Sequence, residues 1–188
     1  MQKRHKTFVA INLPPDIKKF LANYQKRWQD LPAKWVGPDN LHITLSFLGY
    51  LTDVEVGNVC MVAKSVAESH NSFEINLNKI SYGPIDKKVP RMVWLSGEKS
   101  KELSALKRDL ENQLSESIRF KPEVRTFNPH ITLARVKTFE WRAIDPEERQ
   151  EVNEYIDLSL SVGSIEIMES VLKKGAPEYT IIESHQLK

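Results

Sequence analysis

The sequence is poor in the features that mark several common classes of protein. It contains one cysteine, Cys60, so no internal disulfide can form, and we expect a buried, unreactive thiol. No apolar run approaches the ~20 residues that cross a membrane, and the run from Phe8 to Leu13 is too short for a secretory signal. The chain has no HExxH, CxxC or GxSxG motif. These absences predict a cytoplasmic protein with no membrane partner, and they argue against zinc and serine hydrolases.

The charge is balanced. Lys and Arg number 27 against 25 Asp and Glu, which leaves a formal net charge of +2 and does not by itself indicate a nucleic-acid binder. The chain is 188 residues long, 40% hydrophobic and 28% charged, as is ordinary for a globular protein. No flexible linker interrupts it, so we expect residues 1–188 to form a single domain of two intimately packed lobes.

One tetrapeptide occurs twice. His42-Ile43-Thr44-Leu45 is repeated as His130-Ile131-Thr132-Leu133, and an asparagine stands two residues before each histidine, at Asn40 and Asn128. Apolar and polar residues alternate through both copies, which predicts two strands. Residues two apart in a strand share a face, at about 6.6 Å for roughly 3.3 Å per residue, so each histidine should stand beside its own threonine. The polar faces should line a groove, and the apolar faces should pack on helices.

These residue types suit phosphodiester cleavage. Imidazole has an ordinary pKa near ~6.5, so one histidine can accept a proton while the other donates one. Threonine hydroxyls can donate hydrogen bonds to phosphate oxygens in the transition state. No metal or other cofactor is required. A zinc site would need a third ligand, which the repeated motif does not supply. A single copy would most simply be an ordinary strand, but the pairing favours a catalytic site.

The predicted elements repeat in order. Strand 7–13 leads into a helix that starts at Pro14-Pro15-Asp16 and carries apolar residues as far as Leu31, and the first motif strand follows. A helix with a capping-box start at residue 52 and a strand over 73–77 come next. Strand 91–96, helix 98–118 and the second motif strand repeat the pattern. The charged segment 145–155 is either a short helix or a loop, and strands over 156–162, 164–172 and 178–187 end the chain.

These motifs resemble those of a known family. Two HxTx motifs are typical of the 2H phosphoesterases, and the flanks resemble its LigT branch, the RNA 2',3'-cyclic phosphodiesterases also called 2'-5' RNA ligases. The similar stretches run nearly from end to end: residues 7–15, 35–36, 40–49, 90–95, 129–136 and 165–179. The resemblance implies a two-lobed α+β fold of duplicated β-α-β units. Mainly antiparallel sheets would face a central groove, with helices outside.

The resemblance also implies an activity. A 2',3'-cyclic phosphate at an RNA end would be hydrolysed to a 2'-phosphomonoester, and reversal would join RNA halves by a 2'-5' bond. By analogy with the family, His42 protonates the 3'-oxygen and His130 activates water. The two identical motifs do not themselves distinguish these roles. Thr44 and Thr132 would hold the phosphate oxygens, and the partners would be RNA ends or cyclic nucleotides. We expect a monomer.

Further residues are candidates for binding substrate. Arg135 corresponds to an arginine of LigT-like relatives and could bind phosphate. Strict strand alternation places it opposite His130, unless the strand twists or bulges. Trp35, Phe127 and Tyr179 could stack on a base, although core packing explains them equally well. The remaining histidines, His5, His70 and His185, lack the motif and are expected at the surface.

Two alternatives remain open. The substrate could be another cyclic phosphate or a 2'-5' oligonucleotide. In a different class, the chain could be an RNA-end binding module whose His and Thr pairs hold a phosphate without turnover. Intact histidines in both copies favour turnover.

Overall fold

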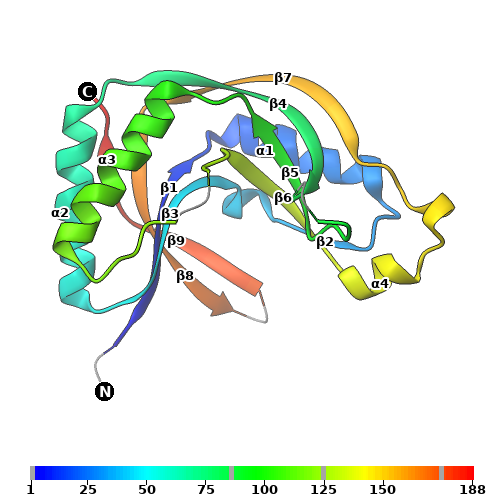
Figure 1. The fold of residues 1–188 in the computed structure, drawn as a ribbon, viewed down its shortest axis with the longest axis horizontal. Coiled ribbons are helices and arrows are strands. Elements are labelled where there is room, and N and C mark those ends of the chain that lie inside the picture. The colour runs from blue at the N-terminus through cyan, green and yellow to red at the C-terminus, as the bar shows by residue number, and fades with distance from the viewer. Residues whose placement is uncertain (1–2, 85–86, 124–125, 174–175) are drawn as a thin grey trace.

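The computed structural model describes residues 3–84, 87–123, 126–173 and 176–188, and its elements are drawn in Figure 1. The strands are β1 (His5–Asn12), β2 (Ala33–Trp35), β3 (His42–Leu51), β4 (Phe73–Gly83), β5 (Met92–Gly97), β6 (His130–Val136), β7 (Asn153–Val162), β8 (Ser164–Lys173) and β9 (Ala176–Gln186). The helices are α1 (Pro15–Tyr24), α2 (Asp53–Ser69), α3 (Lys101–Ser117) and α4 (Thr138–Ala143). Short 3-10 turns cover Gln25–Trp28, Pro38–Asn40 and Pro146–Glu148.

Local chemistry sets where the helices begin. Pro15 opens α1, where a missing N–H costs nothing. Thr52 and Glu55 form the predicted capping box of α2, because each side chain bonds to the other residue's backbone N–H. The Ser100 hydroxyl accepts the N–H of Leu103 at 3.0 Å, so α3 begins at Lys101 and not at the predicted residue 98.

The strands form one antiparallel sheet in the order β7-β4-β5-β6-β3-β1-β8-β9, and β2 pairs with β6 beside this path. The two sheet halves meet between β3 and β6, where one residue pair, Ile43 with Ile131, is in register. The two sheets expected from sequence are therefore halves of one sheet joined at the centre of the two motifs. The duplicated units are β1–α1–β3 and β5–α3–β6.

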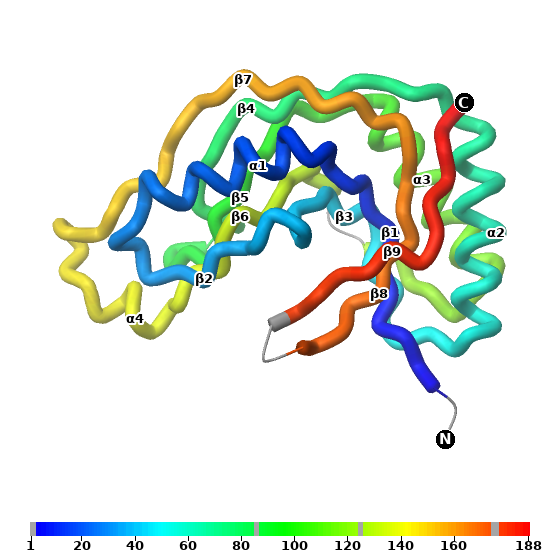
Figure 2. Tube along the Cα trace, turned by 180° about the vertical axis from the view of Figure 1, so that it is seen from behind, coloured from blue at the N-terminus to red at the C-terminus, as the bar shows by residue number. Residues whose placement is uncertain are grey.

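The helices cover the sheet on its outer side and leave the motif faces open. Helices α2 and α3 pack side by side at one end, with α3 also against β3 (Figure 1). Helix α1 lies across β5 and β6 on the far side, and it is seen in front of them in Figure 2. The core between these layers contains Val9, Ile43, Leu95 and Ile131, all fully buried.

Several predicted boundaries differ from the structure. The first helical pattern was expected to reach Leu31, but α1 ends at Tyr24 and a 3-10 turn continues it to Trp28. The charged segment 145–155 forms the 3-10 turn Pro146–Glu148 before β7 begins at Asn153. Strand β2 and helix α4 were not predicted, because three and six residues carry too little periodicity.

His5 ties three elements together. Its Nδ1 lies 2.8 Å from Oε1 of Glu169 on β8, and its Nε2 lies 2.9 Å from Oδ1 of Asp53 at the start of α2. The hydrogen bonds to Glu169 and then to Asp53 raise the pKa of His5. The protonated imidazole is therefore the form that stabilises the fold.

We expect His5→Gln to lower the unfolding midpoint at about pH 5.5 more than at about pH 9. A raised pKa gives stability that is fully present below the unfolded value, near ~6.5, and lost as the pH rises through the folded value. Thermal unfolding of both proteins across this range measures the difference. Asp53→Asn should reduce the same pH dependence. A difference between wild type and variant that stays constant with pH would contradict this role.

Candidate active site

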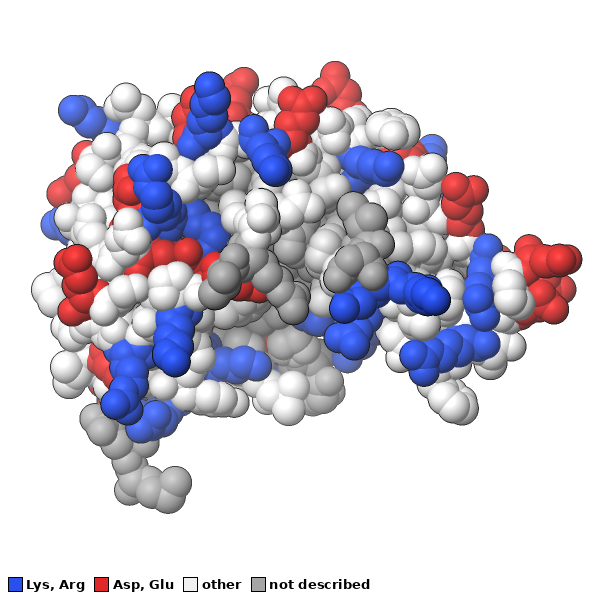
Figure 3. Space-filling model, in the orientation of Figure 1, with Lys and Arg blue, Asp and Glu red and all other residues white. Residues whose placement is uncertain are grey.

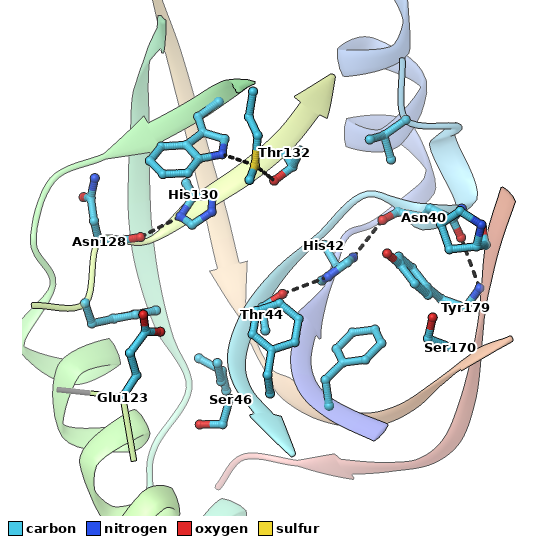
Figure 4. Close-up of a pocket in the computed structure, with 18 of the residues that line it drawn as sticks. Asn40, His42, Thr44, Ser46, Glu123, Asn128, His130, Thr132, Ser170 and Tyr179 are labelled. Carbon is cyan, nitrogen blue, oxygen red and sulfur yellow. Dashed lines mark hydrogen bonds between the residues drawn. The ribbon is translucent and has the colours of Figure 1, made fainter. Parts of the chain in front are cut away.

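A groove of about 900 Å³ opens between the two sheet halves, and both HxT motifs line it. Figure 4 shows the motif side chains converging from two directions, with His42 and Thr44 from β3 and His130 and Thr132 from β6. Basic side chains flank the hollowed front face (Figure 3). The basic residues that line the groove are Lys6, Lys34, Lys107, Lys121 and Arg135. A positive rim around paired imidazoles suits an anionic ligand.

The strand register places the motifs against each other. Ile43 pairs with Ile131 in an antiparallel sense, and both side chains are fully buried in the core. Continuing that register by one residue sets His42 towards Thr132 and Thr44 towards His130, on the opposite, groove side. Each imidazole thus has a hydroxyl from its own strand and one from the other half nearby, which is an arrangement able to surround one phosphate.

A β-bulge follows each motif. On β1, Val9 and Ala10 pair with Ser46 and Thr44, so Leu45 is skipped. On β5, Val93 and Trp94 pair with Ala134 and Thr132, so Leu133 is skipped in the same way. The extra residue reverses the alternation beyond each motif.

The second bulge explains the position of Arg135. Strict alternation predicted that Arg135 points away from His130. Because the alternation reverses at Leu133, Arg135 lines the groove together with His130. Phe47 occupies the equivalent position in the first half and also lines the groove.

His42 is held in one orientation. Its Nδ1 lies 2.7 Å from the carbonyl oxygen of Asn40, and its Nε2 lies 2.9 Å from the Thr44 hydroxyl. A carbonyl can only accept, so Nδ1 carries the proton and Nε2 is the site that gains or loses one. Burial lowers the pKa of His42, and the positive charges of Lys18 and Arg135 and the neighbouring His130 lower it further.

His130 has the same anchor but a different neighbour. Its Nδ1 lies 2.8 Å from the carbonyl oxygen of Asn128, which fixes the same tautomer. Its ring stacks on the indole of Trp94, with centroids 4.0 Å apart. Burial lowers the pKa of His130, and the carboxylate of Glu123 opposes that effect. In the part of the chain that the structure describes, no hydrogen bond reaches its Nε2.

Asn40 does more than anchor His42. Its side-chain Nδ2 donates to the carbonyl of Pro177 at 2.8 Å, and its Oδ1 accepts the backbone N–H of Tyr179 at 3.2 Å. These bonds fix β9 beside the first motif, and they place the Tyr179 ring edge-on to His42 at 5.2 Å. The sequence showed Asn40 only as part of a repeat.

The other candidate aromatic residues are partly packing residues. Trp35 lines the groove while it stacks on Trp28 at 6.3 Å, and Tyr179 lines the groove while it packs on Phe8 at 5.1 Å. Phe127 also lines the groove, under the ammonium of Lys107. Each of the three therefore presents some surface to a ligand and some to the protein.

Sequence reasoning missed a buried polar cluster beside the motifs. Lys107 and Glu111 of α3 form an ion pair that lines the groove, although each residue is only 8% exposed, and the Ser46 hydroxyl donates to Glu111 at 2.9 Å. The spacing of i and i+4 between Lys107 and Glu111 was the available signal, but surface pairs have the same spacing.

The remaining titratable candidates lie away from the groove. The three histidines expected at the surface are partly buried: the side chains of His5, His70 and His185 are 12%, 16% and 10% exposed, and each stands beside a carboxylate. Burial, followed by contact with Glu183, raises the pKa of Cys60 to about 12, so its thiol stays protonated at neutral pH.

The described residues contain neither a metal-binding cluster nor a membrane-spanning helix. No group of three or more His, Cys, Asp or Glu side chains in these ranges is arranged to hold a metal ion. None of the helices in these ranges has the length and apolar content needed to cross a membrane.

Comparison with known proteins shows the family and the fold. The family model described as LigT like Phosphoesterase matches twice, over residues 11–94 and 93–177. A Methanothermobacter thermautotrophicus protein named RNA 2',3'-cyclic phosphodiesterase is 28% identical, covering 97% of this chain and 98% of its own. A crystal structure from Thermus thermophilus has a TM-score of 0.82 at 26% identity, covering 97% of both chains. E. coli LigT complexed with 3'-AMP has a TM-score of 0.80 at 24% identity, covering 98% of this chain and 99% of its own. The two model matches span both motif-bearing halves, and the chain therefore belongs to the LigT-like phosphoesterase family.

Proposed function

We propose that this protein is an RNA 2',3'-cyclic phosphodiesterase that works by acid–base catalysis between two histidines, without a metal. One observation carries the proposal: two imidazoles with the same fixed tautomer flank a single residue pair, Ile43–Ile131, and line one groove. The relatives named RNA 2',3'-cyclic phosphodiesterase support the substrate class. The product would be a 2'-phosphomonoester.

The proposed step is an in-line displacement at phosphorus. His130 takes a proton from water through Nε2 while the water oxygen bonds to phosphorus. The bond from phosphorus to the 3'-oxygen breaks, and His42 gives its Nε2 proton to that oxygen. Thr44 and Thr132 donate hydrogen bonds to the non-bridging oxygens, where negative charge accumulates.

The surroundings of the histidines support this assignment of roles. Burial, and then the positive charges of Lys18 and Arg135, disfavour a charged His42, so its protonated form is the less populated one and a strong acid once it forms. Nε2 of His130 has no hydrogen-bond partner among the described residues, whereas Nε2 of His42 already bonds the Thr44 hydroxyl. Arg135 would bind phosphate, and Trp35 and Tyr179 would contact the base or ribose. If the 5'-hydroxyl of a second RNA attacks in place of water, the same displacement expels the 3'-oxygen and leaves a 2'-5' phosphodiester bond, which is ligation.

The proposal needs both halves of the sheet, because each supplies one histidine. We therefore propose that residues 1–188 act as a single domain. A monomeric state and a cytoplasmic location stay predictions from the sequence. The alternatives also remain testable: another cyclic phosphate or a 2'-5' oligonucleotide as substrate, or a module that binds RNA ends without turnover.

The pH profile with EDTA present tests this mechanism. Productive free enzyme needs one histidine protonated and the other neutral, so kcat/KM should be bell-shaped, with limbs that belong to the coupled pair. Both pKa values are lowered from ~6.5, so the optimum should lie on the acidic side of that value. A bound anionic phosphate favours the protonated imidazoles, so the kcat profile should lie at higher pH than that of kcat/KM.

The substrate used in this test is an oligonucleotide that ends in a 2',3'-cyclic phosphate, and end-group analysis measures its turnover. Activity that EDTA removes and added metal restores would overturn the mechanism. Tight binding of the cyclic end without turnover at any pH would favour the binding module.

A further inference from the structure

The two identical motifs have different neighbours on the adjoining strands. Ala10 of β1 stands beside Thr44, and Trp94 of β5 stands beside Thr132, at the equivalent place in each half. A methyl group in one half therefore corresponds to an indole in the other. Although the two motifs are identical, the two imidazoles therefore have different chemical surroundings.

The indole of Trp94 is fixed against His130. The ring centroids are 4.0 Å apart and the planes are 30° from parallel. The indole N–H donates to Sδ of Met92 at 3.2 Å, which orients the ring along its strand. On the neighbouring strand, a Cβ at Gly83 would lie 2.3 Å from the indole, so a residue without a side chain is needed there for the ring to fit.

His42 has no comparable stacked partner among the described residues. Phe8 and Tyr179 lie 5.0 and 5.2 Å from it, tilted by 37° and at 86°. His42 also faces the positive charges of Lys18 and Arg135. Both imidazoles therefore have an aromatic ring within about 6 Å, but only the ring beside His130 is stacked, and His42 in addition faces two positive charges.

We propose that Trp94 is a positioning residue for His130, and that its indole face stabilises the imidazolium formed when His130 accepts the proton of the attacking water. The negative face of an aromatic ring attracts a cation within about 6 Å, and tryptophan does so most strongly. Trp94 also lines the groove, and in this role it acts through His130. The role of His130 as base rests on the proposed function.

Other groups also act on the charge of His130. In the described structure these are Glu123, from the segment before β6, which favours the cation, and His42 of β3, which opposes it when protonated. Burial opposes the cation as well, and the Asn128 carbonyl favours it. The contribution of Trp94 to the pKa of His130 therefore has to be separated from changes in side-chain shape and in hydration. Fluorination of the indole achieves this separation.

The experiment replaces Trp94 in the full chain by mono-, di- and trifluorotryptophan. Fluorine withdraws charge from the ring face with little change of shape, so the stack stays while the attraction weakens. We expect the pKa of His130 to fall stepwise, by about 0.5 to 1 unit over the series. The pKa is read by NMR from the imidazole C–H signal that His130→Ala removes. In the same series kcat should fall by about two- to tenfold.

The control is the same series at Trp141, which stacks on Arg149 outside the groove and should leave the pKa of His130 unchanged. Trp94→Leu adds a second test. If the indole only shields His130 from water, its loss would raise the pKa of His130, whereas the proposal predicts a fall. The proposal would be overturned if the pKa of His130 did not change across the fluorotryptophan series, or if it rose in folded Trp94→Leu.

These pKa values are measured on free protein. If the pKa of His130 falls across the fluorotryptophan series but the protein shows no turnover, the proposed function is rejected and the effect of Trp94 on His130 is retained. If there is turnover but no fall in this pKa, only the role of Trp94 is rejected.

Discussion

Alanine at His42 or at His130 is expected to reduce kcat by about 10²- to 10⁴-fold, which is the usual cost of losing a positioned acid or base. The two substitutions together should cost little more than either one alone, because both groups serve one displacement. Hydrolysis of an oligonucleotide ending in 2',3'-cyclic phosphate, followed under single-turnover conditions, measures these rates.

His70→Gln is the matched control for this test. His70 bonds Asp109 at 3.1 Å at the end of α2 and does not line the groove, so activity should stay close to that of wild type. The circular dichroism and unfolding midpoint of each variant establish that it is folded. A folded variant at His42 or His130 with near-normal turnover would rule out the two-histidine mechanism, and losses that multiply in the double variant would indicate separate roles.

Valine at Thr44 or at Thr132 is expected to lower kcat/KM by about 10- to 10³-fold, by analogy with the loss of an oxyanion donor. Valine keeps the β-branched shape and the strand propensity, so the change is confined to one hydroxyl. Thr44→Val also removes the hydroxyl that bonds Nε2 of His42. It should therefore shift the limb of the kcat/KM pH profile that reports protonation of the catalytic acid. A pH series of kcat/KM for both variants measures this difference.

Thr180→Val is the control, since Thr180 is an exposed residue of β9 and its hydroxyl takes no part in the groove. Unchanged kcat/KM in both motif variants would mean that the threonines serve only the strands.

Much of the site could be predicted because its signal is local. Alternation around His42 and His130 predicts two strands with one polar face, and the repeated spacing predicts that the two faces act together. The capping box at Thr52 and the proline start of α1 are equally local, and both are present in the structure. The duplication follows from the repeated order of these elements, and the α+β class follows from the resemblance to the LigT branch.

The rest depends on contacts between strands that the sequence does not show. Nothing in the second motif indicates that Leu133 is skipped in the ladder, and without that bulge Arg135 would point away from the groove. Trp94 fits the alternation of its own strand, and only the pairing with β6 brings it onto His130. Surface ion pairs resemble Lys107 and Glu111 in spacing, so only the packing of α3 on β3 reveals their burial.

Asn40 couples the carboxyl-terminal hairpin to a proton-transfer group. Its side-chain amide bonds the backbone of Pro177 and Tyr179, as a neighbouring strand would, and its backbone carbonyl fixes the tautomer of His42 two residues later. A shift of this hairpin would therefore move the backbone that determines which nitrogen of His42 carries the proton. Sequence changes in β8 and β9, far along the chain from both motifs, would then appear as altered chemistry at His42 as well as altered affinity for the substrate.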